Sequence, residues 1–263
     1  MTISRTILLV LPVLLFSGCG KKESAEQNQT ETTAQETARY RTGAEQVGPV
    51  ATSLTERREA SRAKQPTDRK SVMVSFNENL AQSGILEKAL KVGDTIPSFN
   101  LENALGSRIN SADLLAQGPM VLVFYRGSWC PYCNLYLQSL QDSLSGIKAA
   151  GGTLVAVTPE YPDESITTVE KHGLEFEVLS DPGLKTARQF GLVYEFTPAL
   201  DSVYAGFGLN LREHNRTEKS ELPIPATYVI DRSGRIVYAF LDTDYTYRAE
   251  PSEVIAALRK LQS

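Results

Sequence analysis

The chain of 263 residues is poor in the residues that build metal sites, with three cysteines and two histidines. A structural zinc site normally takes four Cys or His ligands, often as two close pairs. Cys130 and Cys133 form one close pair, but Cys19, His172 and His214 are scattered along the chain. We therefore expect neither a metal site nor a cofactor.

The chain also lacks an excess of positive charge. It has 27 Lys and Arg against 31 Asp and Glu, a formal net charge of −4. No basic stripe interrupts this balance, and nucleic-acid binding proteins usually carry one. We therefore expect no nucleic-acid partner.

No apolar run is long enough to span a membrane as a helix. The run from Ile7 to Phe16 has about 10 residues and contains Pro12, whereas a spanning helix needs about 20. A short apolar run after the basic Arg5 is typical of a secretory signal, so residues 1–19 are expected to be a signal peptide.

The end of this segment, Leu15-Phe-Ser-Gly-Cys19, resembles a bacterial lipoprotein processing box. The resemblance implies cleavage before Cys19 and acylation of Cys19, because stable anchoring needs more than one lipid chain. The domain would then be tethered to a membrane of the cell envelope, on its extracytoplasmic side. The alternative is an ordinary secretory signal with a chance cysteine.

Residues 20–71 contain few large apolar side chains and are rich in Glu, Gln, Thr, Lys and Ala. Such a composition cannot bury enough apolar surface to fold. We expect a disordered tether over residues 20–71, followed by one domain over residues 72–263.

The most informative stretch is Phe124-Tyr-Arg-Gly-Ser-Trp-Cys-Pro-Tyr-Cys133. An apolar run ends here in a Gly-Ser turn, and Pro131 suits the first position of a helix, which places Cys130 at the helix N-terminus. Unpaired backbone N–H groups and the helix dipole favour a thiolate there, with a pKa that falls from about 8.5 to between about 3.5 and about 7.5. Cys133 lies one turn further on. The pair can open and close a small disulfide, which is redox chemistry.

From residue 92 onward the pattern alternates between strands and helices. Residues 192–222 show no clear period and are expected to be an insertion with some helix. The predicted hairpin is 92–101 with 107–110; the predicted strands are 119–125, 153–158, 176–179, 226–230 and 235–240, and the predicted helices 131–150, 163–172, 183–190 and 252–261.

Residues 92–261 resemble the alkyl hydroperoxide reductase/thiol-specific antioxidant (AhpC/TSA) family, in its peroxiredoxin-like branch. The resemblance implies an α/β chain with a thioredoxin-like fold, a central mixed sheet flanked by helices, and an N-terminal hairpin extension. Three segments carry the resemblance: Val92–Phe99, Phe124–Cys133 and Ile224–Gly234.

The chain departs from the peroxiredoxin pattern Pro-x-x-x-Thr/Ser-x-x-Cys at two positions. Aligned on it, Arg126 replaces the proline, Cys130 the hydroxyl residue, and Cys133 falls on the peroxidatic cysteine. The family's later arginine falls near Pro225, where thioredoxins carry a cis-proline. The resemblance thus implies a cis Ile224–Pro225 bond, with a trans proline opening an edge strand as the alternative.

The two arguments about the nucleophile disagree. Exposure at the mouth of the helix favours Cys130, whereas the alignment with peroxiredoxins favours Cys133. We expect Cys130.

Other polar residues are less specific. A guanidinium at Arg126 suits a thiolate and a peroxide, although a surface arginine paired with a carboxylate is an equal alternative. Thr158–Glu160 fits a plain turn better than a pocket wall, and we expect His172 and His214 to be solvated. The segment Asp244–Arg248 resembles one common in this branch of the family but receives no role.

These features predict a thiol peroxidase that reduces hydrogen peroxide or an alkyl hydroperoxide through a Cys130–Cys133 disulfide, with a thioredoxin-like dithiol protein as reductant. Arg126 and Pro225 complete the predicted site. The main alternative is a membrane-tethered disulfide reductase. A copper carrier with two thiolate ligands is a third, although its cysteines would normally be spaced by three residues.

Overall fold

The computed structural model describes residues 38–40 and 48–262. The predicted signal peptide, Cys19 and most of the predicted tether lie outside these residues. Within the part that is described, no helix is both long and apolar enough to cross a membrane.

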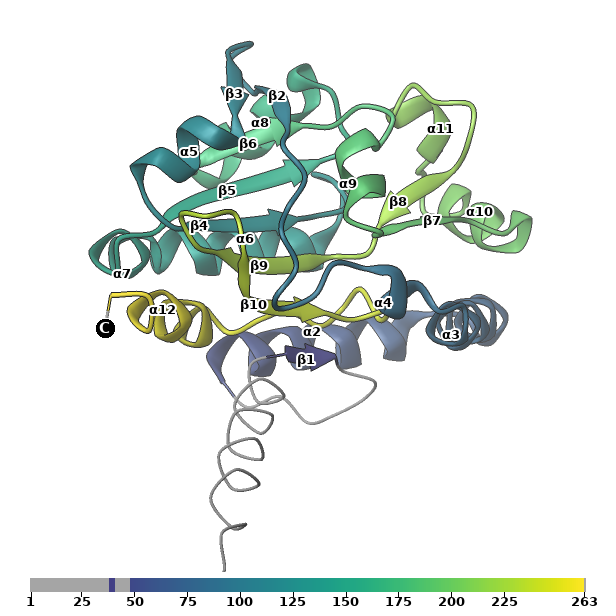
Figure 1. Cartoon of the computed structure of the whole chain (residues 1–263). Helices are drawn as coiled ribbons and strands as arrows, with labels where there is room; N and C mark the ends of the chain where they lie inside the picture. The colour runs from purple at the N-terminus through teal and green to yellow at the C-terminus, as the bar shows by residue number, and fades with distance from the viewer. Residues whose placement is uncertain (1–37, 41–47, 263) are drawn as a thin grey trace, which may run out of the picture.

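A mixed sheet forms the centre of the molecule (Figure 1), with the strand order β1-β10-β9-β4-β5-β6-β2-β3. The central strand β4 runs parallel to β5 and antiparallel to β9. Every residue of β4 and β9 is buried, as expected for strands covered on both faces. The strands are β1 (Ala38–Tyr40), β2 (Asn100–Asn103), β3 (Arg108–Asn110), β4 (Met120–Phe124), β5 (Thr153–Thr158), β6 (Glu177–Ser180), β9 (Ala226–Ile230) and β10 (Ile236–Leu241).

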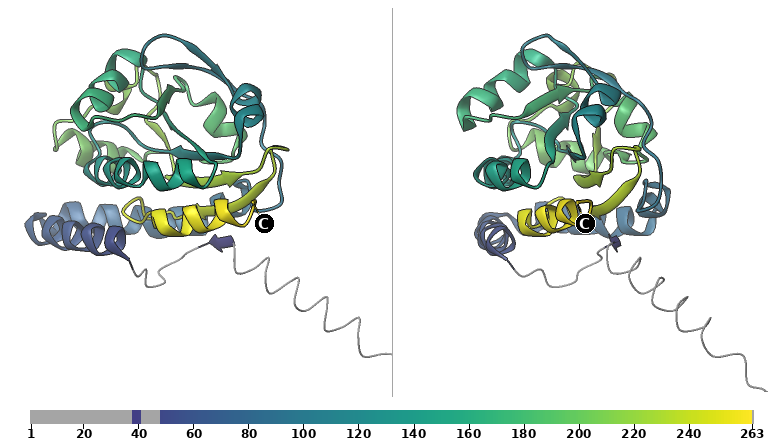
Figure 2. Two further views of the ribbon diagram at one scale, coloured as in Figure 1. Left: turned by 90° about the vertical axis from the view of Figure 1, so that its left-hand side faces the viewer. Right: turned by 60° about the vertical axis from the view of Figure 1, so that its left-hand side comes forward.

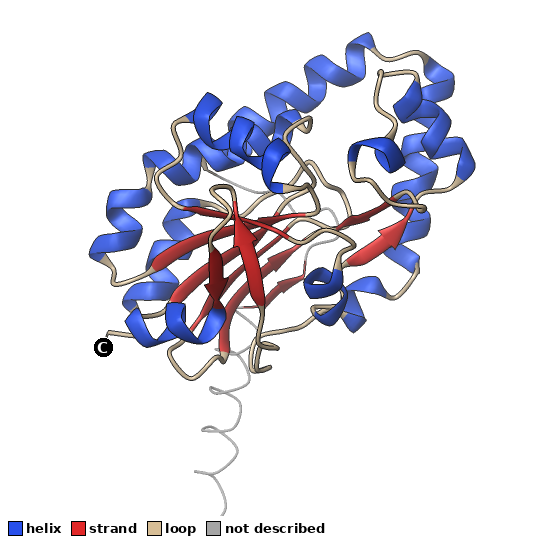
Figure 3. Cartoon of the chain, turned by 90° about the horizontal axis from the view of Figure 1, so that it is seen from above, coloured by secondary structure: helices blue, strands red, loops and turns tan. Residues whose placement is uncertain are grey.

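Alternate residues of β4 point into two separate hydrophobic cores, because side chains alternate across a strand. Met120, Leu122 and Phe124 belong to one core, and Val121 and Val123 to the other. Helices close both faces (Figure 3). The helices of the first face are α4 (Ile85–Lys88), α5 (Ser111–Gln117), α9 (Lys185–Gln189) and α10 (Pro198–Ala205); those of the second are α2 (Pro49–Lys64), α6 (Pro131–Asp142), α7 (Leu144–Ala149), α8 (Pro162–His172) and α12 (Pro251–Arg259).

This arrangement confirms the expected α/β fold and the predicted order of elements. The helix predicted over 131–150 is divided at Ser143 into α6 and α7. The predicted hairpin is β2 paired antiparallel with β3. The insertion carries α10, α11 (Leu211–His214) and a small second sheet of β7 (Val193–Glu195) and β8 (Glu221–Pro223).

The prediction of a disordered tether is wrong for residues 49–71, which form α2 and the start of α3 (Thr67–Gln82). Val50, Leu54 and Arg58 are spaced by four residues and lie buried on one face of α2. The carboxylate of Glu250 accepts hydrogen bonds from the backbone N–H groups of Val50 (3.4 Å) and Ala51 (2.7 Å). A remote side chain thus caps α2, and composition alone gives no sign of such a partner.

Helices α2 and α3 follow each other on one side of the domain (Figure 2). The two helices are joined at Gln65 and Pro66. α2 packs against α6, and α3 packs against α10. This segment therefore contacts both the helix that holds the cysteine pair and the helix that holds Tyr204.

Candidate active site

Cys130 is the N-cap residue of α6, and Pro131 is the first residue of the helix. The Cys130 carbonyl accepts the first helical hydrogen bond, from Asn134 N at 3.0 Å. Gly127 in the preceding loop has φ +147°, and a Cβ there would lie 2.5 Å from Trp129 Nε1. The predicted position of Cys130 at the helix mouth is confirmed, and the loop before it requires glycine.

The expected exposure of Cys130 is wrong. Both thiols are free, and neither cysteine has any solvent-exposed surface. Cys130 nevertheless belongs to the wall of a pocket of about 560 Å³, whereas Cys133 does not. The pocket is covered by residues from three remote segments, among them Gln65, Arg69, Met73, Tyr204, Phe207 and Tyr245.

Arg126 is buried beside the Cys130 sulfur rather than paired on the surface. Its Nη1 donates to Cys130 Sγ at 3.8 Å, and its Nη2 donates to the Tyr204 hydroxyl. Its guanidinium carbon lies 3.9 Å from the ring centroid of Tyr245 and 4.8 Å from that of Trp129. A fixed positive charge is thus held against the thiol by aromatic rings.

A second buried arginine, Arg248, donates a hydrogen bond to the other cysteine, Cys133. Its Nη2 donates to Cys133 Sγ at 3.1 Å, and its Nη1 donates to the carbonyls of Tyr245 and Tyr247. The sequence alone gave no role to the segment Asp244–Arg248, because Arg248 lies 115 residues after Cys133. The resemblance to a segment of the family was the one available signal.

The electrostatics separate the two thiols. Burial raises the pKa of Cys130, but the hydrogen bond from Cys133 and the charges of Arg126 and Arg248 outweigh it and lower that pKa to about 5. Burial and the neighbouring Cys130 charge raise the pKa of Cys133 well above its ordinary value. Near neutral pH, Cys130 is the thiolate and Cys133 keeps its proton.

A buried carboxylate holds the loop before Cys130. Glu160 accepts hydrogen bonds from Ser128 N (2.9 Å), Ser128 Oγ (2.7 Å) and Thr158 Oγ1 (3.3 Å). His214 Nε2 lies 2.6 Å from Glu160 Oε1. The chain bends after Thr158, and this segment does not line the Cys130 pocket, so the turn expected there is present, but the role of its buried Glu160 was missed. The interpretation of His214 as solvated is wrong, because its side chain is 19% exposed and paired with Glu160. These residues link α11 and the end of β5 to the active-site loop.

His214→Asn should destabilise the fold more at pH 6 than at pH 9. The hydrogen bond to Glu160 raises the pKa of His214, so its stabilising contribution is full below about 6.5 and is lost as pH rises through the folded-state pKa. We expect a loss of roughly 1 kcal/mol at pH 6, measured by urea unfolding, since hydrogen bonds to charged groups are worth about 1.5–3 kcal/mol.

His172→Asn is the matched control for this measurement. Burial lowers the pKa of His172, so its pH trend should run the other way. An equal loss for His214→Asn at both pH values would show that the ion pair with Glu160 does not contribute.

The cis bond expected at Ile224–Pro225 is wrong, since the described residues contain no cis peptide bond. Pro225 is buried directly before β9, whose first residue Ala226 pairs with Phe124 at the end of β4. It therefore lies at the sheet edge where the active-site loop begins. Its part in the chemistry stays a prediction.

The described residues hold no group of three or more His, Cys, Asp or Glu side chains placed to bind a metal ion. The groups beside the two sulfurs are arginines and aromatic rings rather than further ligands. The arrangement favours a reactive thiolate.

Among curated relatives, the peroxiredoxin Bcp of Escherichia coli (strain K12) is 34% identical over 104 residues, which cover 39% of this chain and 65% of that protein. The chain thus spans less than two thirds of that relative. The putative peroxiredoxin Rv2521 of Mycobacterium tuberculosis (strain H37Rv) is 27% identical over 172 residues, covering 65% of this chain and 94% of that relative.

Solved structures show the same fold. Peroxidoxin BcpB from Mycobacterium tuberculosis superimposes with a TM-score of 0.53 at 21% identity, covering 66% of this chain and 99% of that chain. The bacterioferritin comigratory protein of Xanthomonas campestris gives a TM-score of 0.51 at 16% identity, covering 65% of this chain and all of that chain. Residues 92–239, more than half of the chain, match the AhpC/TSA family. The protein therefore belongs to the AhpC/TSA family.

Proposed function

We propose that the protein is a thiol peroxidase that reduces hydrogen peroxide or an alkyl hydroperoxide with Cys130 as the nucleophile. The observation that carries this proposal is the Cys130 sulfur, held at a helix N-terminus against the buried Arg126 and bordering a pocket. The family supports it, since the relatives are named peroxiredoxins and the Xanthomonas protein is described by its alkyl peroxide reduction activity.

In the first step, the Cys130 thiolate attacks one peroxide oxygen. A sulfur–oxygen bond forms, the O–O bond breaks, and the leaving oxygen takes a proton and departs as an alcohol or water. Arg126 Nε and Trp129 Nε1 are buried donors without a hydrogen-bond partner among the described residues. The side chains of Arg126 and Trp129 both line the pocket, and the positive charge of Arg126 suits the negative charge that develops on the leaving oxygen.

In the second step, Cys133 attacks the sulfenic acid on Cys130. The new disulfide forms, the sulfur–oxygen bond breaks, and the oxygen leaves as water. Cys133 must give up its proton to react, although burial raises its pKa. The guanidinium of Arg248, 3.1 Å from its sulfur, favours that deprotonation once Cys130 has lost its charge. Arg126 thus stabilises a thiolate at Cys130, and Arg248 stabilises one at Cys133.

The cycle closes when an external thiol reduces the disulfide, and we propose a thioredoxin-like dithiol protein for this step. The intact Cys-Pro-Tyr-Cys motif also suits the alternative function, reduction of disulfides in other proteins. That reaction and the reduction of the oxidised pair by a partner protein both require access to the Cys130 sulfur, which has no exposed surface, so burial does not separate the two functions. The peroxidase is the better-supported function because the relatives are named peroxiredoxins.

Mass spectrometry after one equivalent of hydrogen peroxide tests this proposal. We expect a loss of two hydrogens, mapped to the peptide that holds Cys130 and Cys133, at a rate at least about a hundredfold above that of an ordinary cysteine, whose thiolate fraction is small. Oxidation no faster than that of free cysteine would contradict the proposal, and fast reduction of a protein disulfide would then favour the alternative.

We also propose that the protein is anchored in the bacterial cell envelope through lipid on Cys19. The support is the sequence of residues 1–19 alone. The mass of the mature N-terminal peptide would reveal the acyl chains.

A further inference from the structure

Part of the wall of the Cys130 pocket comes from outside the segment matched by the family, residues 92–239. The last turn of α2, the turn between α2 and α3, and the first half of α3 form one wall of the Cys130 pocket. The opposite rim is formed by residues 207–209, after α10. The wall consists of Ser61, Lys64, Gln65, Pro66, Arg69 and Met73.

One side chain joins the two rims. Arg69 of α3 donates from Nη1 to the Gly206 carbonyl at 3.3 Å. Its guanidinium carbon also lies 5.4 Å from the ring centroid of Phe207. Arg69 thus holds the first half of α3 against the far side of the pocket.

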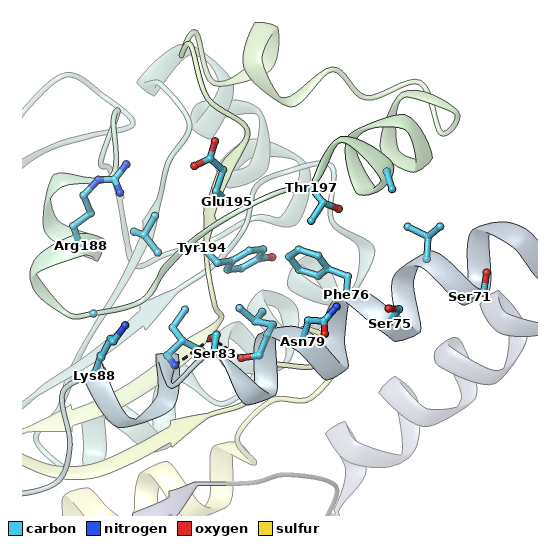
Figure 4. A pocket seen from close by; sticks show the side chains of 16 residues that line it. Ser71, Ser75, Phe76, Asn79, Ser83, Lys88, Arg188, Tyr194, Glu195 and Thr197 are labelled. Atoms are coloured by element: carbon cyan, nitrogen blue, oxygen red, sulfur yellow. Dashed lines mark hydrogen bonds between the residues drawn. The ribbon is translucent and has the colours of Figure 1, made fainter.

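The rest of α3 is held mainly by half-buried side chains. Leu80, near its C-terminal end, is its one buried residue, while Val72, Met73 and Phe76 pack half-buried against the core. The Phe76 ring lies 5.7 Å from that of Tyr194, between centroids, and both residues line a groove of about 790 Å³ beside α3 (Figure 4). Elements with few buried apolar contacts open at low free-energy cost. Gly84, at φ +75°, follows the helix and suits a pivot.

By contrast, α2 is firmly docked. Leu54 is buried, Arg58 donates to Thr246 at 3.1 Å, and Glu250 caps the first turn. Of the two helices, α3 with the turn before it is therefore the less firmly held.

The two reactants of the proposed cycle differ in what they require. A hydroperoxide is small and needs a slight shift of side chains around the pocket. A dithiol protein must bring its own sulfur to about 2.05 Å from one sulfur of the pair, because a mixed disulfide forms by direct attack. With α3 in place, a folded protein cannot approach that closely.

We propose that α3 and the turn before it select reactants by size, with Arg69 as the residue that sets the selection. While Arg69 is bound to the Gly206–Phe207 segment, small molecules reach Cys130 and folded proteins do not. When α3 swings away, a thiolate of the dithiol protein attacks the Cys130–Cys133 disulfide, and a new S–S bond forms as the old one breaks. The second thiol of that protein then attacks the mixed disulfide. Cys130 and Cys133 are released as thiols, and the two sulfurs of the dithiol protein are left joined in a disulfide. This inference rests on the proposed function for the identity of the reductant, but not for the selection itself.

Size-graded alkylation of the reduced full-length protein tests the selection. The probes are iodoacetamide and a maleimide carried on a polyethylene glycol chain too large for the pocket. Peptide mass spectrometry separates labelling at Cys130 from labelling at Cys19. In the wild-type protein we expect labelling of Cys130 by iodoacetamide and slow labelling by the large maleimide, relative to the same reagents on the urea-unfolded chain.

Two variants should weaken the contact between α3 and the Gly206–Phe207 segment, one changed on each side of that contact. Arg69→Ala removes the hydrogen bond, and Gly206→Ala places a Cβ 2.8 Å from Arg69 Nη2 at an ordinary helical backbone conformation. Both should raise the rate of labelling by the large maleimide about two- to tenfold, the range expected for losing one hydrogen bond. The iodoacetamide rate should change less than twofold. Reduction of the disulfide by thioredoxin should rise in parallel, and reduction by dithiothreitol should not.

Lys70→Ala is the matched control, since Lys70 is the exposed neighbour of Arg69 on the same helix. Equal labelling of the wild-type protein by both probes would overturn the inference, as would variants that behave like Lys70→Ala. Alkylation involves no peroxide. The labelling rates therefore test selection by size even if the protein proves to have no peroxidase activity.

Discussion

Cys130→Ser is expected to abolish peroxide consumption, whereas Cys133→Ser should keep the first turnover and lose the following ones. Cys130 carries the lowered pKa and borders the pocket, so its removal takes away the attacking atom. Loss of a nucleophile typically costs roughly a thousandfold or more in rate. Cys133→Ser leaves that atom in place but removes the thiol that condenses with the sulfenic acid.

Stopped-flow measurement of a single turnover and mass spectrometry of the product check this prediction. In Cys133→Ser we expect a sulfenic acid at Cys130 that proceeds to sulfinic acid with excess peroxide, or forms a mixed disulfide with added thiol. Cys130→Ser and Cys133→Ser serve as controls for each other, because each keeps the other cysteine of the pair. Sulfenic acid in Cys130→Ser instead would reverse the two roles and favour the peroxiredoxin alignment.

Arg126→Met should slow the peroxide reaction about ten- to thirtyfold at pH 7. With a pKa of about 5, nearly all of Cys130 is thiolate at that pH. A thiol with the ordinary pKa of about 8.5 is only roughly 3% thiolate there. Removal of the cation moves the Cys130 pKa upward, so the loss of rate should shrink as the pH rises above 9. Any loss that persists at high pH reports the hydrogen bonds that Arg126 offers to the peroxide.

The ultraviolet absorbance of the thiolate, followed against pH, measures the shift directly. We expect the midpoint to rise by about three units in Arg126→Met, because a tenfold loss of thiolate at pH 7 requires a pKa of about 8. It should stay near 5 in Arg188→Met, since Arg188 pairs with Glu221 away from the cysteines. An unchanged midpoint in Arg126→Met would show that Arg248 and the helix N-terminus are sufficient to hold the thiolate.

The sequence predicted the structure best where the signal for an element lies in neighbouring residues. The apolar run before the Gly-Ser turn, and Pro131 after Cys130, are short-range signals, and they placed β4 and the start of α6 correctly. Alternating and helical periods located most later elements to within a few residues, but the first strand of the hairpin, expected over 92–101, is β2 at 100–103, and the elements of the insertion were not placed. The family resemblance supplied the thioredoxin-like fold with its central mixed sheet, which periodicity does not contain.

The error over residues 49–71 has a physical cause. Most side chains of α2 are polar or charged, so its composition resembles that of a disordered segment. The helix is stable because Leu54 enters a core built by other elements, and because Glu250 satisfies its first N–H groups. The spacing of Val50, Leu54 and Arg58 was the one signal in the sequence.

By itself, the sequence determined the Cys-x-x-Cys pair, its place at a helix mouth and the family of the domain, because these depend on residues close together in the chain. The tertiary structure decided that Cys130 is buried, that Arg248 reaches Cys133, that Glu160 holds the active-site loop, and that α3 covers the pocket. Each of these contacts joins segments from 32 to 115 residues apart or places a remote helix over the thiol. Packing creates such contacts, and no local pattern of residues records them.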